Sequence, residues 1–200
     1  MKLYHSPTSP FARKVRVLIR EKDALAQVTE EVAAAMSDPQ SLIEANPLGK
    51  VPALALKDGT SFFDSPLICE YLDTVLDGPQ LFPATGAGRW RALRFQALAD
   101  GIMDAAVSLV FESNRPEAER SEMWMGRWRR AVDRGIDFAE QEVSLLDGPL
   151  DIGGIAIGAA LGYLDFRHAA MNWQARAPEL AGWWRDLAKR PSFAETAPPA

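Results

Sequence analysis

The sequence predicts a small α/β domain followed by an all-helical domain. Short strand patterns occur only in the first third of the 200 residues, whereas helical patterns run from about residue 89 onward with no strand pattern among them. Between these parts lies "DGPQLFPATGAG", a stretch rich in glycine and proline that is typical of a linker. We therefore expect two domains at 1–77 and 89–200, joined by a linker at 78–88.

The first third begins with a strand, a helix and a second strand. "KLY" at 2–4 is a short apolar strand candidate, and "VTEEV" at 28–32 alternates as a half-buried strand does. The helix between them carries a stripe that ends in a charged turn, formed by Phe11, Val15, Leu18 and Lys22. This pattern predicts a helix that covers one face of a sheet.

The next segment predicts an antiparallel hairpin followed by a helix. "VPALAL" and "TSFF" are separated by the turn residues at 57–59 and form the two strands. The segment "DSPLICEYLDTVL" at 64–76 then has an apolar helix face made by Leu67, Ile68, Tyr71, Leu72 and Val75. In the second half, helices are expected within 89–112, 117–146, 152–170 and 178–189.

Composition and charge limit the possible partners. The net charge of −5 argues against general attraction to nucleic acid or to an anionic membrane, although the basic residues Arg13, Lys14 and Arg16 form a local cluster. No apolar run has the length of a membrane span, and the N-terminus does not resemble a signal peptide, so we expect a cytoplasmic protein. Cys69 is the only cysteine and is expected to be a small buried residue.

The two histidines do not suggest a metal site or a hydrolase. His168 lies in a helical segment without a cysteine or histidine cluster, so we expect a polar helix residue and no metal. His5 lies four residues before Ser9, but the G-x-S-x-G motif of a serine hydrolase is absent from the sequence.

Ser9 and Ser65 share a local pattern in which serine precedes proline and an amphipathic helix. The pattern predicts that both serines cap their helices, with proline at the first helical position. The positive end of a helix dipole can also stabilise an anion or a thiolate, so a cap residue can belong to a binding site. The local sequence around Val51-Pro52 gives no reason to expect a cis bond, since most X-Pro bonds are trans.

Three segments in order, "SPTSPFARKVR", "NPLGKVPAL" and "FFDSPLICEYLD", followed by a linker and a helical half, resemble cytosolic-type glutathione transferases. The resemblance covers nearly the whole chain and is greatest to bacterial members with a serine at the start of the first helix. "ALADGIMDA" and "LGYLDFR" are similar to that group's helical domain. The resemblance implies a thioredoxin-like N-terminal domain with a mixed four-stranded sheet, then an all-α C-terminal domain.

The resemblance implies that Ser9 donates a hydrogen bond to the sulfur of glutathione and favours its thiolate. A free thiol has a pKa of about 8.5, and lowering it by about 2 units requires about 2.7 kcal/mol of preferential thiolate stabilisation. One hydroxyl donor together with a helix N-terminus supplies stabilisation of that order.

The same resemblance implies how the rest of glutathione is held. Val51 and Pro52 correspond to a cis-proline turn, in which the Val51 backbone pairs with the cysteinyl residue. Asp64 faces the γ-glutamyl ammonium, and Ser65 binds the γ-glutamyl carboxylate at a helix start. Lys50 either approaches the glycyl carboxylate or is a solvated loop lysine.

Asp100 resembles the aspartate that reaches across a dimer interface toward the γ-glutamyl group of the neighbouring subunit, which implies a homodimer; the alternative is a surface carboxylate. Residues near the first helix start or on one helix face after Asp100 are candidates for the pocket of the second substrate. They are Phe11, Met103, Val107 and Phe111. The family's buried helix often begins with a capping box, whereas here Asp151 can cap but Gly154 replaces the acid.

These features predict a glutathione transferase with glutathione as co-substrate, no metal, and a small hydrophobic electrophile as second substrate. One alternative is a glutathione-dependent peroxidase, reductase or dehalogenase that uses the same site. Another is a non-catalytic glutathione-binding module, because folds of this kind are reused without their chemistry.

Overall fold

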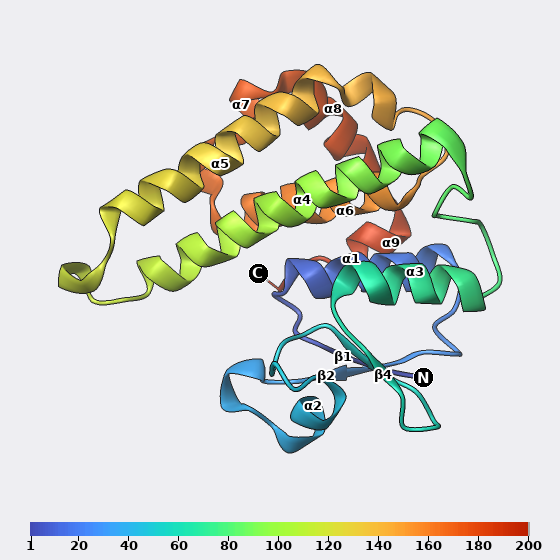
Figure 1. Cartoon of the computed structure of the whole chain (residues 1–200). Coiled ribbons are helices and arrows are strands. Elements are labelled where there is room, and N and C mark those ends of the chain that lie inside the picture. Colours follow the sequence, from blue (N-terminus) through green and yellow to red (C-terminus); the bar gives the residue numbers. More distant parts are fainter. Residues whose placement is uncertain (200) are drawn as a thin grey trace. The chain divides into compact units, whose positions relative to one another are not determined.

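A computed structural model describes residues 1–199 and divides into two compact units (Figure 1). Unit 1 is Met1–Arg89 together with the segment from Arg190 onward, and unit 2 is Trp90–Lys189. The first boundary lies close to the predicted start of the helical domain. The C-terminal segment differs from the expectation because it joins unit 1.

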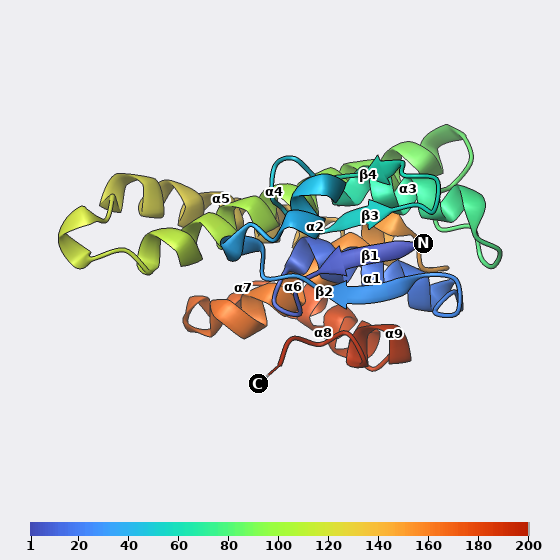
Figure 2. The ribbon, with the colours of Figure 1, turned by 90° about the horizontal axis from the view of Figure 1, so that it is seen from below.

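Unit 1 contains a four-stranded sheet in the order β2-β1-β3-β4 (Figure 2). The strands are β1 Lys2–His5, β2 Thr29–Val32, β3 Ala53–Ala55 and β4 Ser61–Phe62. β1 pairs in parallel with β2 and antiparallel with β3, and β3 pairs antiparallel with β4. The sheet is therefore mixed, as predicted, and the hairpin strands are shorter than their sequence patterns.

Two helices of unit 1, α1 Pro10–Glu21 and α3 Ser65–Val75, lie on the same side of the sheet (Figure 1). Val15 and Leu18 of the predicted α1 stripe are fully buried. In α3 the predicted apolar face is partly wrong, because Leu67 and Val75 are exposed at 49% and 47%. The buried side of α3 instead combines Ser65, Ile68, Cys69 and Leu72.

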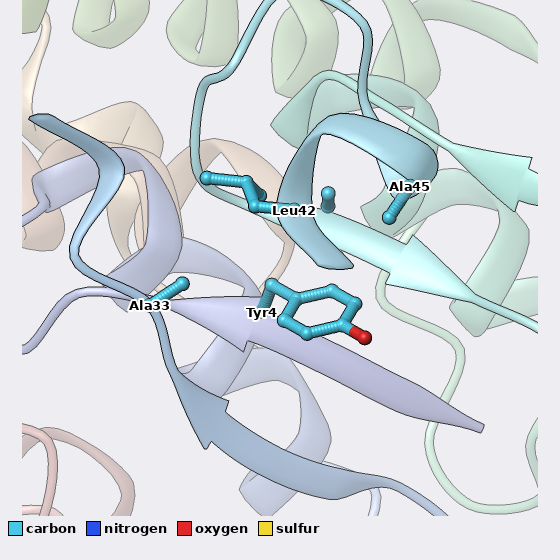
Figure 3. Packing of buried hydrophobic residues seen from close by; sticks show 5 residues of the cluster. Tyr4, Ala33, Leu42 and Ala45 are labelled. Atoms are coloured by element: carbon cyan, nitrogen blue, oxygen red, sulfur yellow. The ribbon is translucent and has the colours of Figure 1, made fainter. Parts of the chain in front are cut away.

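The opposite face of the sheet is covered by α2 Gln40–Ala45, a helix that the sequence analysis did not predict. Leu42 and Ala45 of α2 pack over Tyr4 of β1, as Figure 3 shows. Ala33 and Ala53 complete this small buried cluster. A 3-10 turn at Ala35–Ser37 precedes α2.

The C-terminal segment belongs to unit 1, where it bonds to polar side chains of α1. The segment forms a short helix, α9 Pro191–Ala194. Arg13 is buried and donates a hydrogen bond to the Phe193 carbonyl at 3.0 Å. Arg190 forms an ion pair with Glu21 at 2.7 Å. Arg13, which belongs to the predicted basic cluster, therefore forms its hydrogen bond within unit 1.

Unit 2 consists of helices and the turns and loops that connect them. The helices are α4 Gly86–Ser113, which begins in unit 1, then α5 Glu122–Gln141, α6 Ile152–Arg167, α7 Trp173–Arg176 and α8 Pro178–Leu187. Short 3-10 turns lie at Glu117–Glu119, Val143–Leu146 and Ala169–Met171. No helix within residues 1–199 combines the length and apolar character needed to cross a membrane.

α6 forms the buried centre of unit 2, since every residue from Ile152 to Leu164 is buried. Its N-cap is Asp151, whose carboxylate accepts a hydrogen bond from the Gly154 backbone at 3.0 Å and pairs with Arg91. The predicted cap is therefore present without the second half of the capping box. A Cβ on Gly153 would lie 2.8 Å from the Ala92 carbonyl oxygen, so this glycine allows close packing of α6 on α4.

Candidate functional site

The sheet topology of unit 1 brings three predicted site segments to one edge. β1 ends at His5, and Tyr4 pairs with Ala53 at the start of antiparallel β3. Leu54 pairs with Phe62, so β4 ends at the same edge. The segments after β1, before β3 and after β4 therefore begin or end at the same edge of the sheet. They contain Ser9, Val51-Pro52 and Asp64-Ser65.

Ser9 is the N-cap of α1, as predicted, in an extended backbone conformation. Its Oγ accepts a hydrogen bond from the Ala12 backbone N–H at 3.2 Å. Accepting this bond does not use the hydroxyl proton, because a serine hydroxyl has one donor and two acceptor positions. The cap geometry is therefore compatible with donation to a ligand atom in front of the helix.

The second segment is a loop organised by Asn46. The Val51-Pro52 bond is cis, as the resemblance to glutathione transferases implies. Asn46 is buried, and its amide donates to the Lys50 carbonyl at 2.8 Å while its side-chain oxygen accepts from the Leu48 N–H at 3.0 Å. The sequence analysis missed this positioning role, for which the turn-forming residues "NPLG" are the available signal. Lys50 is exposed.

Ser65 differs from the prediction because it does not cap α3. Asp64 occupies the N-cap position without a side-chain capping bond, and Ser65 is the first helical residue. The Phe63-Asp64 peptide bond is also cis. Ser65 is 1% exposed, and its Oγ has no hydrogen-bond partner within residues 1–199. A buried hydroxyl without a partner is costly in a folded protein, so it points to a ligand at the start of α3.

His5 lies at the same sheet edge and is buried, with no partner for its Nδ1 in the described chain. Burial, with Arg16 as a second cause, lowers the pKa of His5 below its ordinary value although the carboxylate of Glu30 opposes this shift. His5 is therefore neutral at pH 7. Within residues 1–199 no group of three histidine, cysteine, aspartate or glutamate side chains could hold a metal ion.

The remaining predicted residues occupy different environments. Met103 of α4 is fully buried and belongs to the core, whereas Phe111 is 54% exposed. Val107 and Asp100, also on α4, are partly exposed, as is Phe11 on α1 of unit 1. Val107 and Phe111 thus have accessible surface that a second substrate could contact, whereas Met103 does not.

The chain is similar to known proteins in both sequence and structure. Residues 3–80 match the family model described as glutathione S-transferase, N-terminal domain. Over its whole length the chain is 39% identical to the uncharacterized GST-like protein YibF of Escherichia coli, of which it covers 99%.

Solved structures of bacterial glutathione transferase family members are also similar. One from Pseudomonas fluorescens with bound glutathione has a TM-score of 0.96 at 39% identity, covering 100% of this chain and 99% of that one. Another, from Methylobacillus flagellatus with glutathione bound, has a TM-score of 0.93 at 37% identity, covering 99% of each chain. The present chain belongs to the glutathione S-transferase family.

Proposed function

We propose that this protein binds glutathione at the sheet edge of unit 1 and activates its thiol for attack on a small hydrophobic electrophile. The observation that carries the proposal is the buried, unpartnered Ser65 hydroxyl at the start of α3, on the same edge as the Ser9 cap and the cis Val51-Pro52 bond. The relatives that hold glutathione support the same ligand.

Each part of the tripeptide has a chemically suitable partner at this edge. The γ-glutamyl carboxylate accepts from the Ser65 hydroxyl and from backbone N–H groups in the first turn of α3, where the helix dipole favours an anion. The exposed Asp64 carboxylate pairs with the γ-glutamyl ammonium. Val51, just before β3, extends the sheet by backbone pairing with the cysteinyl residue, and Lys50 faces the glycyl carboxylate.

Thiol activation is assigned to Ser9. Its hydroxyl donates to the sulfur while its lone pair keeps the Ala12 N–H satisfied. A hydrogen bond donated to an ionised sulfur is stronger than one donated to a neutral thiol, so the thiolate is favoured. The thiolate then forms the new C–S bond and displaces a leaving group from the electrophile.

We further propose a homodimer in which Asp100 of the partner subunit approaches the bound γ-glutamyl group. From their positions in the sequence we also propose Phe11, Val107 and Phe111 as contacts of the electrophile, whereas the buried Met103 is a core residue. Sedimentation equilibrium of the purified protein tests the dimer, and a monomer at all concentrations would contradict it.

The activation step is tested by titrating the protein with glutathione while thiolate absorbance is followed as a function of pH. We expect a lowered thiol pKa in the wild type and in Ser9→Thr, which keeps a hydroxyl, but not in Ser9→Ala. Ser121→Ala is the matched control, because Ser121 caps α5 through the Trp124 N–H in the same manner. Binding without a lowered thiol pKa would contradict the mechanism and favour a glutathione-binding module.

A further inference from the structure

A buried asparagine joins the end of α2 to the loop before β3. Asn46 is 2% exposed, and both its backbone and its side chain form hydrogen bonds inside this segment. Its backbone N–H donates to the Leu42 carbonyl at 2.7 Å, and its carbonyl accepts from the Gly49 N–H at 2.9 Å. The side-chain amide has one possible orientation, because its partner at Lys50 is a carbonyl and its partner at Leu48 is an N–H.

The support of Asn46 is part of the core of unit 1. Leu42 and Ala45, in the last turn of α2 before Asn46, pack in the buried cluster over Tyr4 of β1 (Figure 3). The side chain of Val51 packs against the same cluster. The loop from Asn46 to Val51 is therefore anchored at both of its ends.

The hydrogen bond from Asn46 to Lys50 sets the orientation of one peptide group. The bond between Lys50 and Val51 is trans, unlike the next one along the chain. In a planar trans peptide the carbonyl and the N–H point in opposite directions. Because the Lys50 carbonyl points to Asn46, the Val51 N–H points away from it. This N–H has no hydrogen-bond partner within residues 1–199, so it is available to a ligand.

We propose that Asn46 is a positioning residue for glutathione, which holds the Val51 N–H in the direction that pairs with the cysteinyl carbonyl. This inference rests on the proposed function. Asn46 acts only through the peptide group between Lys50 and Val51. Since that group is held before the ligand arrives, its rotation does not have to be restricted on binding, which favours affinity. The effect concerns the backbone of the tripeptide and is independent of its thiol.

Ophthalmate, γ-glutamyl-2-aminobutyryl-glycine, separates backbone binding from thiol activation because it has the backbone of glutathione and no thiol. Asn46→Ser leaves a side chain too short to reach the Lys50 carbonyl. In calorimetric titrations we expect this variant to bind ophthalmate and glutathione about three- to tenfold more weakly than the wild type. Ser9→Ala should weaken glutathione only. Unchanged ophthalmate affinity in Asn46→Ser would overturn the positioning role.

Asn46→Asp tests the donor function of the side chain through a pH profile. An ionised carboxylate can accept from the Leu48 N–H but cannot donate to the Lys50 carbonyl, whereas a neutral carboxyl group can do both. Burial beside a carbonyl favours the neutral form of the introduced group as the pH falls. We therefore expect ophthalmate affinity, relative to the wild type, to be about tenfold lower at pH 7.5 and to recover toward pH 5.

Leu48→Asp is the matched control for charge. Leu48 is 66% exposed, so this variant adds a carboxylate to the same loop without changing the Asn46 side chain. Its ophthalmate affinity should change less than about twofold, because an exposed charge in this loop is screened by solvent. A loss and recovery equal to those of Asn46→Asp would show a charge effect and contradict the positioning role.

The peptide group can also be observed without a ligand. Lysine precedes valine only at Lys14-Val15 and Lys50-Val51, so 13C-labelled lysine carbonyls and 15N-labelled valine amides give two linked NMR signals. The Lys14-Val15 pair lies in α1 and is the internal reference. We expect Asn46→Ser to shift the Lys50-Val51 signal and to leave the reference unchanged. An unchanged Lys50 carbonyl resonance would overturn the inference.

These measurements separate the inference from the proposed function. A wild type that binds neither ophthalmate nor glutathione would contradict the proposed function, and with it the positioning role. A wild type that binds both, with an Asn46→Ser variant that binds them equally well, would contradict the positioning role alone. Urea unfolding verifies that the variant is folded under the titration conditions. If Asn46→Ser does not fold, the pH profile of Asn46→Asp decides in its place.

Discussion

Lys22 and Asp73 form a buried ion pair in unit 1, with 2.7 Å between Nζ and Oδ1. The two side chains are only 2% and 5% exposed. Lys22 also donates to the carbonyls of Asp73 and Leu76, and the Asp73 carboxylate accepts from the backbone of Leu81 and Phe82. The pair therefore joins the ends of α1 and α3 to the start of the predicted linker.

Removal of the Asp73 carboxylate should destabilise unit 1 strongly. We expect Asp73→Ala to lower the free energy of unfolding by about 3–5 kcal/mol, because the Lys22 ammonium would stay buried without its counter-charge. Asp77→Ala changes an exposed carboxylate in the same region and should cost less than about 0.5 kcal/mol. Urea unfolding of both variants measures the difference, and similar losses in both would contradict the role of the pair.

Gly153 is expected to be intolerant of a side chain although alanine is the better helix former. The Gly153 Cβ would approach the Ala92 carbonyl oxygen to 2.8 Å and the Phe95 Cβ to 2.9 Å. We expect Gly153→Ala to destabilise the protein by about 1–3 kcal/mol, since overpacking exceeds the gain in helix propensity.

Gly182 of α8 provides the opposite control, because nothing lies within 4 Å of its Cβ position. Gly182→Ala should stabilise the protein by about 0.5–1 kcal/mol through helix propensity alone. Thermal unfolding compares the two variants. A stabilised Gly153→Ala protein would mean that α6 moves away from α4 at little cost.

Stability should begin to fall when the pH drops below about 6.5. Burial lowers the pKa of both His5 and His168, so the unfolded chain takes up protons near pH 6.5 that the folded chain resists. Each histidine can contribute a slope of at most about 1.4 kcal/mol per pH unit. For Glu30, burial opposes but the hydrogen bonds from Arg20 and Arg16 prevail and lower its pKa, so its contribution is lost only below about pH 4.5.

Urea unfolding between pH 7.5 and 5 measures this pH dependence of stability, because the histidines make the largest contribution to it in that range. His168→Gln should remove part of the slope, because one of the two depressed groups is absent. An unchanged slope in this variant would show that His168 does not titrate on unfolding.

The succession of strands along unit 1 and the Ser9 cap could be predicted from local patterns, but α2 could not. Its six residues lie between Pro39 and Asn46-Pro47, and so short a segment contains less than two helical turns of periodicity. α9 was missed for a related reason: Pro191 ends the preceding pattern but occupies the first position of a new short helix.

The environment of Ser65 shows where sequence patterns stop being informative. The serine before proline in "DSP" predicts Ser65 as the cap, although aspartate is an equally suitable residue type for a cap. The fold places Asp64 at the cap and buries Ser65. Burial depends on how α3 packs on its neighbours, so an unpartnered hydroxyl could not be read from the local pattern.

Ser65→Ala should therefore separate binding from stability. Removing a buried hydroxyl without a protein partner relieves a desolvation cost, so we expect the free energy of unfolding of the unliganded protein to stay constant or to rise by up to about 1 kcal/mol. Glutathione affinity should fall about tenfold, because a hydrogen bond to the charged γ-glutamyl carboxylate is lost. Calorimetric titration with glutathione and urea unfolding measure the two effects.

Ser9→Ala is the informative comparison for this variant, since loss of an N-cap should lower the free energy of unfolding by about 1 kcal/mol. Two serines at one sheet edge would then respond oppositely in stability. If Ser65→Ala instead destabilised the unliganded protein by more than Ser9→Ala does, the Ser65 hydroxyl would have a structural role. That result would remove the observation on which glutathione binding at the start of α3 depends.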